Sequence, residues 1–284
     1  MKDDPRAAQF LRELSESRGP LPLDMPIAVV VAHPDDEVAG LGAQLPRFGN
    51  LWLVHVTDGA PRNPEYARSA GFASREDYAR ARRAELDDAL AVAGISPKTE
   101  VIGVADQDAS LHLTDISREL AALLRTVAPA VVITHPYEGG HPDHDATAFA
   151  VHAACRLLDA EQVVAPTVCE TTSYHNRDGR IEVFEFLPGN WDTGAVEGVT
   201  TIRLNDDERA QKRRMFDCFP SQQAPLDWFP IELERFRAAP RYDFTAPPHE
   251  GQLFYEMFDW GITGPRWREM ARDALAALPA KGRC

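Results

Sequence analysis

Continuous apolar runs alternate with amphipathic stretches through the first half of the chain. The apolar runs predict strands, over 26–32, 51–57, 100–105 and 130–134. Such a run, without polar alternation, is typical of a strand buried on both faces of a parallel sheet. The amphipathic stretches predict helices, over 5–16, 37–45, 74–93, 114–127 and 144–160. Strands separated by helices indicate βαβ units with right-handed crossovers, which gives an α/β fold.

The regular alternation ends near residue 165. Shorter strands are predicted beyond it, over 168–174, 181–187 and 200–204, and helices over 206–218 and 265–278. No linker-like break in composition separates the two parts. We therefore expect one domain over residues 1–284, with a core over about 26–165 and a C-terminal elaboration over about 166–284. The expected architecture is a Rossmann-like, mostly parallel sheet flanked by helices.

Composition and charge argue against nucleic acids and membranes as partners. Lys and Arg total 30 and Asp and Glu total 44, so the formal net charge is −14. Because nucleic-acid affinity depends on neutralising phosphates with basic side chains, we expect no nucleic-acid partner. The apolar runs are far shorter than the ~20 residues of a membrane-spanning helix, so we expect no membrane contact. A polar start and four cysteines without a CxxC pair indicate a cytoplasmic protein.

Two motifs rich in His and Asp follow predicted buried strands. The first is AHPDDE, residues 32–37, and the second is HPDH, residues 141–144. Strand ends of a parallel sheet meet at one edge, so we expect both motifs at the same site. Each motif alone could be a loop with a capping Asp and a turn-forming Pro. Their occurrence as a pair at strand ends favours a site with chemistry.

Imidazole and carboxylate together suit Zn²⁺ or Fe²⁺. The spacing of His33 and Asp36 allows one turn to direct both at a single ion, and His141 or His144 can supply a third ligand. The other His is then available as an acid, and Asp143 can orient an imidazole. Asp35, beside a ligand, can accept a proton from water. These residue types predict metal-assisted hydrolysis.

With these residues the chain resembles the PIG-L (LmbE-like) family of metal-dependent N-deacetylases. Weaker similarities extend over about residues 26–222, in Thr57-Asp58-Gly59, in the R-x-x-E of Arg82 and Glu85, and in Lys212 with Ser221-Gln222. The family hydrolyses amides of N-acetylglucosamine-type sugars. The resemblance therefore implies an enzyme that removes an acetyl group from such a sugar or its conjugate.

The resemblance also implies a role for each residue of the two motifs. The implied ligands of Zn²⁺, with Fe²⁺ as the alternative metal, are His33, Asp36 and His144. Asp35 corresponds to the family's proposed general base. His141 corresponds to its proposed acid or oxyanion stabiliser, and Asp143 to the residue that holds the His141 ring.

The chain departs from the family pattern at two places. Some relatives have a Tyr two residues before HPDH that helps to stabilise the tetrahedral intermediate. This chain has Gly139 there, and Tyr137 is the nearest tyrosine. The family often has a His two residues before the late SQ pair, where this chain has Phe219. These differences leave the tyrosine's role open.

Substrate contacts are expected in the loops after the strands. Arg62 is our choice to grip the sugar, and Asp108, with Asp106 beside it, could bind sugar hydroxyls. Each choice has an alternative interpretation: Arg62 could be a solvated surface arginine, and the Asp residues could merely form a polar turn. Aromatic residues of the C-terminal part could stack on a sugar, but core packing is the stronger expectation, for Trp191, Trp228, Tyr242, Phe254, Tyr255 and Trp260.

The leading hypothesis is zinc-dependent de-N-acetylation of an N-acetylglucosamine-type sugar or its conjugate. A small amino-sugar molecule would then be the partner. The alternatives are an amidase acting on a thiol conjugate or another amide, and a catalytically silent module that binds a sugar or a metal.

Overall fold

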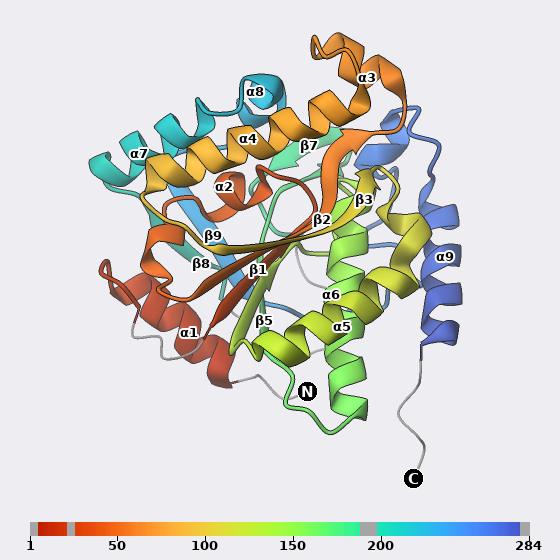
Figure 1. Cartoon of the computed structure of the whole chain (residues 1–284). Coiled ribbons are helices and arrows are strands. Elements are labelled where there is room, and N and C mark those ends of the chain that lie inside the picture. Colours follow the sequence, from red (N-terminus) through yellow and green to blue (C-terminus); the bar gives the residue numbers. More distant parts are fainter. Residues whose placement is uncertain (1–4, 22–25, 188–197, 279–284) are drawn as a thin grey trace.

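A computed structural model describes residues 5–21, 26–187 and 198–278 of the chain. Its centre is a seven-stranded sheet in the order β3-β2-β1-β4-β5-β9-β8 (Figure 1). The strands are β1 (Ile27–Val31), β2 (Leu51–Pro61), β3 (Lys98–Asp106), β4 (Val131–Thr134), β5 (Thr167–Thr171), β8 (Thr200–Arg203) and β9 (Leu233–Ala238). The pairs from β3 to β5 are parallel, and β9 is antiparallel to both of its neighbours. The Rossmann-like α/β prediction is confirmed.

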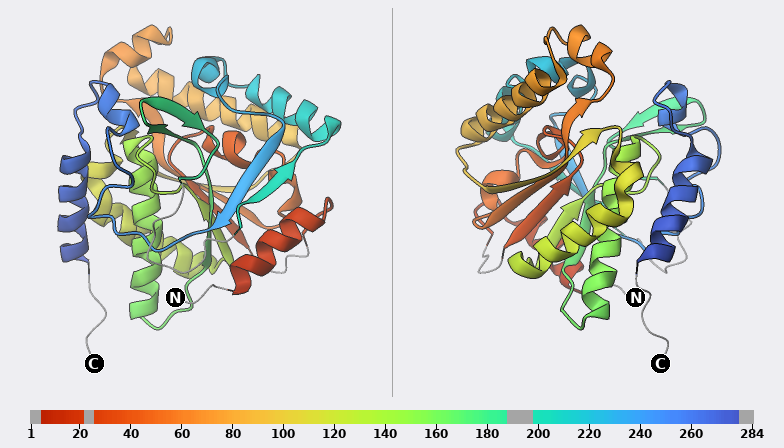
Figure 2. Two further views of the ribbon diagram at one scale, coloured as in Figure 1. Left: turned by 180° about the vertical axis from the view of Figure 1, so that it is seen from behind. Right: turned by 45° about the vertical axis from the view of Figure 1, so that its right-hand side comes forward.

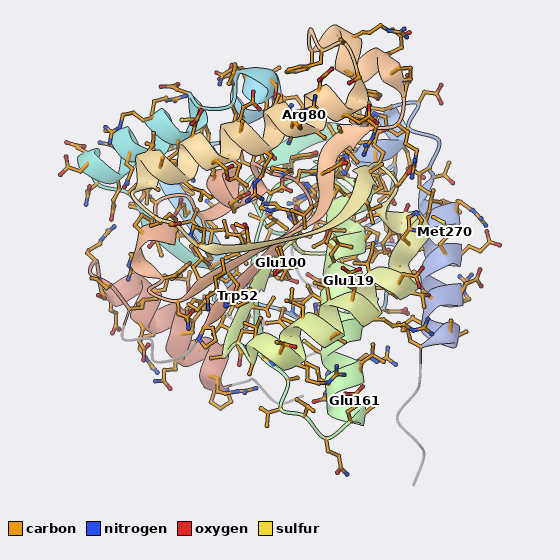
Figure 3. The ribbon with its side chains drawn as sticks, viewed as in Figure 1. Trp52, Arg80, Glu100, Glu119, Glu161 and Met270 are labelled. Atoms are coloured by element: carbon orange, nitrogen blue, oxygen red, sulfur yellow. The ribbon has the colours of Figure 1, made fainter. Side chains whose placement is uncertain are left out.

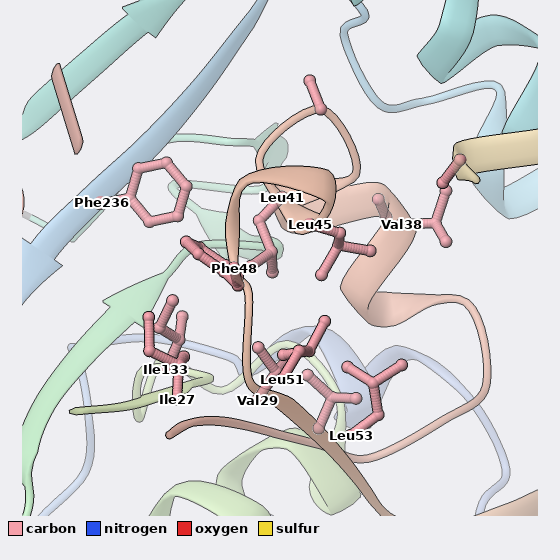
Figure 4. Close-up of a cluster of buried hydrophobic side chains, with 14 of the residues drawn as sticks. Ile27, Val29, Val38, Leu41, Leu45, Phe48, Leu51, Leu53, Ile133 and Phe236 are labelled. Atoms are coloured by element: carbon pink, nitrogen blue, oxygen red, sulfur yellow. The ribbon is translucent and has the colours of Figure 1, made fainter. Parts of the chain in front are cut away.

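Helices cover both faces of the sheet, as two views of the ribbon show (Figure 2). One face packs against α1 (Pro5–Glu16), α2 (Asp36–Leu41), α4 (Arg75–Ala93) and α7 (Asp206–Phe216). The other packs against α5 (Leu113–Val127), α6 (Pro142–Ala160) and α9 (Gly264–Ala277). Successive side chains of a strand point to opposite faces, so Val29 joins the first core and Val30 the second. Figure 4 shows the first core around Ile27, Val29 and Phe236.

Short elements complete the described chain. They are η1 (Leu45–Arg47), α3 (Pro64–Ser69), η2 (Ala109–His112), β6 (Tyr174–Arg177), β7 (Arg180–Val183), η3 (Pro220–Gln222), α8 (Gln223–Leu226) and η4 (Phe254–Met257). The strand predicted over 168–174 ends at Thr171, and β6 begins a separate hairpin with β7. The long helix begins and ends as predicted: the Ser74 side chain accepts from the Asp77 amide, and Gly94 is left-handed. None of the described helices has the length and apolarity that a membrane span requires.

The sequence did not predict β9, because its residues, LERFRA, include three charged side chains. Two of these charges are buried in the sheet and paired: Glu234 with Lys212, and Arg237 with Glu170. β9 and β8 continue the sheet beyond its parallel strands, so the C-terminal elaboration is part of the same sheet. The exposed acidic residues lie elsewhere, and Figure 3 shows three of them, Glu100, Glu119 and Glu161.

The pair formed by Lys212 and Glu234 lies where α2, α7 and β9 meet. The Lys212 ammonium donates to the Ala39 carbonyl and to Glu234, each at 2.9 Å. Glu234 also accepts from the Ala43 backbone and from the Gln44 side chain at 2.9 Å. All the hydrogen-bonding atoms of this buried pair are therefore directed at the segment that follows the first motif.

We predict that Lys212→Met lowers the free energy of unfolding by about 3–5 kcal/mol, since it leaves Glu234 buried without its cation. The measurement is urea denaturation of both proteins. Arg209→Ala, which removes an exposed partner of Asp206, is the control, with an expected change of about 0.5 kcal/mol or less. Equal stabilities of wild type and Lys212→Met would contradict the prediction.

Candidate active site

The two motifs meet where the strand order of the sheet reverses. β1 lies between β2 and β4, and the chain leaves β1 and β4 toward opposite faces, into α2 and α6. Such a switch point leaves a crevice at the carboxyl ends of the strands. His33 follows β1 directly, and His141 is the N-cap residue of α6. The expected convergence of AHPDDE and HPDH is therefore present.

The Asp36 carboxylate is the centre of this site. Its oxygens lie 3.2 Å from His33 Nδ1, 3.2 Å from His144 Nε2 and 3.3 Å from His135 Nε2. Its Oδ2 also accepts from the His33 backbone amide at 2.7 Å, which closes the turn of the motif. Burial alone would raise the pKa of Asp36, but His144, His135 and His33 together hold it well below its usual value. The carboxylate is thus ionised among imidazoles.

A second set of contacts surrounds the other side of His33. Its Nε2 lies 3.2 Å from Asp106 Oδ1 and 3.4 Å from Asp143 Oδ2. Burial opposes a charge on His33, but Asp106 and Asp36 outweigh it and raise the His33 pKa well above the ordinary value. Asp143 is fixed in turn by the backbone amides of Gln107 and Ala109, which donate to its two oxygens at 2.6 and 3.0 Å.

The Asp143 backbone, rather than its carboxylate, holds the His141 ring. The Asp143 amide donates to His141 Nδ1 at 3.2 Å, whereas the nearest Asp143 carboxylate oxygen is 4.0 Å away. A ring that accepts at Nδ1 carries its proton on Nε2 when it is neutral. Burial, with the nearby His33, lowers the His141 pKa well below the usual value. His141 therefore presents a neutral N–H at this end of the sheet.

Asp35 faces a buried arginine. Arg82 Nη2 lies 3.0 Å from Asp35 Oδ2, and its Nη1 donates to the Gly59 carbonyl at 2.8 Å. Burial raises the pKa of Asp35 to about 6 in spite of Arg82. Glu37 is not directed at the site: its carboxylate accepts from the Asp35 amide at 3.1 Å and lies 3.0 Å from His55 Nε2. It supports the backbone of the motif.

The weaker motifs of the sequence have structural roles around Asp35. Arg82, of the R-x-x-E pair, holds the Asp35 carboxylate. Its companion Glu85 accepts from the Ser221 amide at 2.9 Å and from the Ser221 hydroxyl at 2.6 Å. Gly59 has φ +70°, and a Cβ there would lie 2.9 Å from Pro34. The late SQ segment and the Asp58-Gly59 turn thus support the helix and loop that carry Arg82.

The two predicted substrate residues contact each other. Arg62 pairs with Asp108, and the Arg62 side chain is 70% exposed. Asp106, which sequence reasoning grouped with Asp108 for sugar hydroxyls, lies against His33 instead. The pair is at the surface of the loops that follow β2 and β3.

Sequence reasoning missed His135 and Tyr174. His135 follows β4 at once, and the strand-end rule that selected His33 would have found it. Its Nε2 accepts from the Ala32 amide at 3.1 Å. Tyr174 is on β6, with its ring centroid 5.7 Å from that of His144. It lies 30 residues beyond His144, in the β6–β7 hairpin; strands were predicted nearby, over 168–174 and 181–187, but the pattern did not indicate that this segment returns to HPDH.

The two glycines before HPDH explain the departure from the family's tyrosine. Gly139 has φ +71°, and a Cβ there would lie 2.8 Å from Leu253. A Cβ on Gly140 would lie 1.9 Å from the Tyr174 carbonyl oxygen. Tyr137 does not replace the tyrosine, because it is buried and its hydroxyl donates to the Ala246 carbonyl at 2.9 Å. No side chain fits at 139 or 140 without moving a neighbour.

The residues present suit a divalent metal ion. Close sets of potential ligand atoms include His33 with His141 and His144, and Asp36 with His135 and His144. Four carboxylates, Asp35, Asp36, Asp106 and Asp143, gather here, and Arg82 pairs with one of them, Asp35. Neutral imidazole and ionised carboxylate are the forms that bind a metal. A cation would offset the remaining negative charge.

Fold and site together define a Rossmann-like α/β protein with a His and Asp site at the switch point of its sheet. The model of the PIG-L family, described as GlcNAc-PI de-N-acetylase, matches residues 28–155. The chain belongs to this family of metal-dependent N-deacetylases.

Three similar proteins of known name are deacetylases. The chain is 28% identical over 221 residues to a probable N-acetyl-alpha-D-glucosaminyl L-malate deacetylase 2 of Bacillus cereus, covering 74% of this chain and 96% of that protein. A Bacillus anthracis protein of the same name is 30% identical over 178 residues, covering 57% and 75%. The structure of the A40926 pseudoaglycone deacetylase Dbv21 superposes with a TM-score of 0.56 at 18% identity, covering 75% and 96%. That last likeness concerns the fold.

We predict that Gly140→Ala lowers the free energy of unfolding by about 1–3 kcal/mol, because its Cβ would displace the Tyr174 backbone. Denaturation in urea measures the change. Gly49→Ala is the control: nothing lies within 4 Å of its added Cβ, so we expect no loss of stability there. A Gly140→Ala protein as stable as wild type would show that β6 does not pack against this loop.

Proposed function

We propose that this chain hydrolyses the N-acetyl amide of an N-acetylglucosamine-type sugar or its conjugate, with Zn²⁺ as the metal and Fe²⁺ as the alternative. The observation that carries the proposal is the Asp36 carboxylate between His33 and His144, beside a buried Asp35. The names of the two Bacillus relatives support the substrate class, since each is a probable deacetylase of an N-acetylglucosaminyl conjugate. We also infer a single domain and a cytoplasmic location.

His33, Asp36 and His144 are the proposed metal ligands. His135 is not included, because its Nε2 lone pair is used by the Ala32 amide. Asp143 is not included either, because both its oxygens accept from backbone amides. These two residues instead orient the ligands from behind. When bound, a zinc ion supplies a Lewis acid that polarises a carbonyl and acidifies water.

Asp35 is the proposed general base. Its carboxylate is next in sequence to a ligand, and Arg82 holds it at 3.0 Å in one orientation. A base with a pKa of about 6 is ionised at neutral pH and still basic enough to take a proton from an activated water. The proton then passes from Asp35 toward the amine that leaves.

His141 is the proposed stabiliser of the tetrahedral intermediate. Its neutral ring has Nε2–H free to donate, because Nδ1 accepts from the Asp143 amide. A donor placed where the carbonyl oxygen becomes negative stabilises the transition state. The lowered pKa of His141 favours this role over that of an acid that gives up a proton. Arg62 and Asp108 remain proposed contacts to the sugar at the rim of the loops.

We predict that His33→Ala, Asp36→Ala and His144→Ala each lose the bound metal. Each removes one of the proposed ligands around the same point. Metal content by mass spectrometry after loading with Zn²⁺ and dialysis is the measurement. His112→Ala, on η2 and outside the clusters of potential ligands, is the control and should keep the metal. Full metal content in the Asp36→Ala protein would refute this ligand set.

We predict that Asp35→Asn keeps its metal and loses turnover by about 10²–10⁴-fold, since an amide cannot accept the proton. Acetate release from N-acetylglucosamine and its glycosides is the assay, and Asp87→Asn, on the exposed side of α4, is the matched control. Full activity in Asp35→Asn would remove Asp35 as the base. Release of another acid, or cleavage of a thiol conjugate alone, would favour the amidase alternative. A protein that binds metal but hydrolyses none of the amides would favour the silent binding module.

A further inference from the structure

A row of aromatic side chains lies beside the histidines of the candidate site, and part of it is exposed at the surface. We call Tyr174, Trp228, Phe254, Phe258 and Trp260 the aromatic rim. Neighbouring ring centroids are 5.9 Å apart for Tyr174 and Trp228, and 6.2 Å for Trp228 and Phe254. They are 5.0 Å apart for Phe254 and Phe258, and 4.8 Å for Phe258 and Trp260, which are stacked. The row is therefore continuous.

Both ends of the aromatic rim contact the candidate active site. Trp260 lies 4.8 Å from the His141 ring, and Tyr174 lies 5.7 Å from the His144 ring. The β6–β7 hairpin and the segment before α9, which carry these residues, lie at one end of the molecule in both views of Figure 2. A molecule held at His141 and His144 would thus reach the aromatic rim with any group that projects from it.

Part of this row is exposed, contrary to the expectation of core packing. Trp228 and Phe258 are each 44% exposed, and Met257 beside Phe258 is 48% exposed. Phe254, in contrast, is buried, as are Tyr255 and most of Tyr242, and Trp191 lies outside the described residues. Exposed aromatic rings beside a catalytic site are typical of a ligand contact, because they bind planar apolar groups.

The arginines of the loop and helix that follow β2 already have anionic partners. Every arginine of residues 58–82 is paired with a carboxylate, in the pairs Arg62–Asp108, Arg68–Glu65, Arg75–Asp58, Arg80–Asp77 and Arg82–Asp35. A carboxylate or phosphate on the aglycone would have to displace one of these partners. Apolar stacking needs no such exchange.

We propose that the aromatic rim is the aglycone subsite of this enzyme, and that the amino-sugar substrate carries a planar, apolar aglycone that stacks on Trp228 and Phe258. This inference rests on the proposed function and extends it to the second half of the substrate. It assigns the reactive N-acetyl group to the His and Asp site and the aglycone to rings of the C-terminal elaboration.

The test compares phenyl and methyl glycosides of N-acetylglucosamine, in both anomers, which differ only in the aglycone. We expect a KM about tenfold lower for the better phenyl glycoside than for its methyl counterpart, the size of a good aromatic contact. Trp228→Ala and Phe258→Ala should bring the ratio of the two KM values close to one. Val164→Ala, an 83% exposed apolar residue after α6, is the matched control and should leave the ratio as in wild type. Equal KM values in wild type would overturn the proposal while leaving the deacetylase function standing.

Binding separates the failure of the subsite from the failure of the function. Calorimetric titration of Asp35→Asn with both glycosides measures affinity without turnover. Tighter phenyl binding that disappears when Trp228→Ala is added supports the aromatic rim even if wild type releases no acetate. Sedimentation of wild type and Trp228→Ala tests the other occupant: a dimer that becomes a monomer in the variant would make this face a contact between two copies, and would overturn the proposal.

Discussion

The structure depends on burying several carboxylates at one edge of a sheet. Asp36, Asp106 and Asp143 all lie against His33, Asp35 is next to Asp36 in the chain, and like charges in a dry site repel strongly. Different groups stabilise these buried negative charges. Imidazoles face Asp36, backbone amides bind Asp143, and Arg82 faces Asp35. The arrangement holds negative charge at the proposed metal site, and this is also what makes the site costly to assemble.

Other parts of the fold hold these stabilising groups in position. Arg82 stays in place because α4 is fixed at both ends of its R-x-x-E, by Gly59 and by Ser221. The segment after the first motif is fixed by Lys212, which binds both the Ala39 carbonyl and Glu234 of β9. The C-terminal elaboration therefore does more than cover the sheet edge. It supplies the buried charges and hydrogen bonds that keep α2 and α4 rigid around Asp35.

Sequence alone was sufficient for the parallel half of the fold and for the two motifs. Ile27–Val31 and Leu51–Pro61 are apolar throughout most of their length because both faces are buried, and the strand-end rule then located His33 and Asp36. The apolar pattern did not predict the strand Leu233–Ala238, because this interior strand buries charged side chains. Its Glu234 and Arg237 are paired with residues distant in the sequence. The position of Tyr174 could not be predicted either, because it depends on packing between distant segments: Tyr174 approaches His144 only because Gly140 has no side chain.

The two motifs and the aromatic rim lie in different parts of this chain. The matched family model ends at residue 155, after the last residue of both motifs, whereas every member of the aromatic rim lies beyond it. In the proposed mechanism the charges and imidazoles of the two motifs must stay fixed, because a small displacement of Asp35 or His141 would slow the reaction. The exposed rings beyond residue 155 have no such constraint in that mechanism, because they take no part in the hydrolysis. Gly139 and Gly140 lie between these two parts: they leave no side chain between the second motif and the β6–β7 hairpin, so Tyr174 can approach the histidines of the motifs.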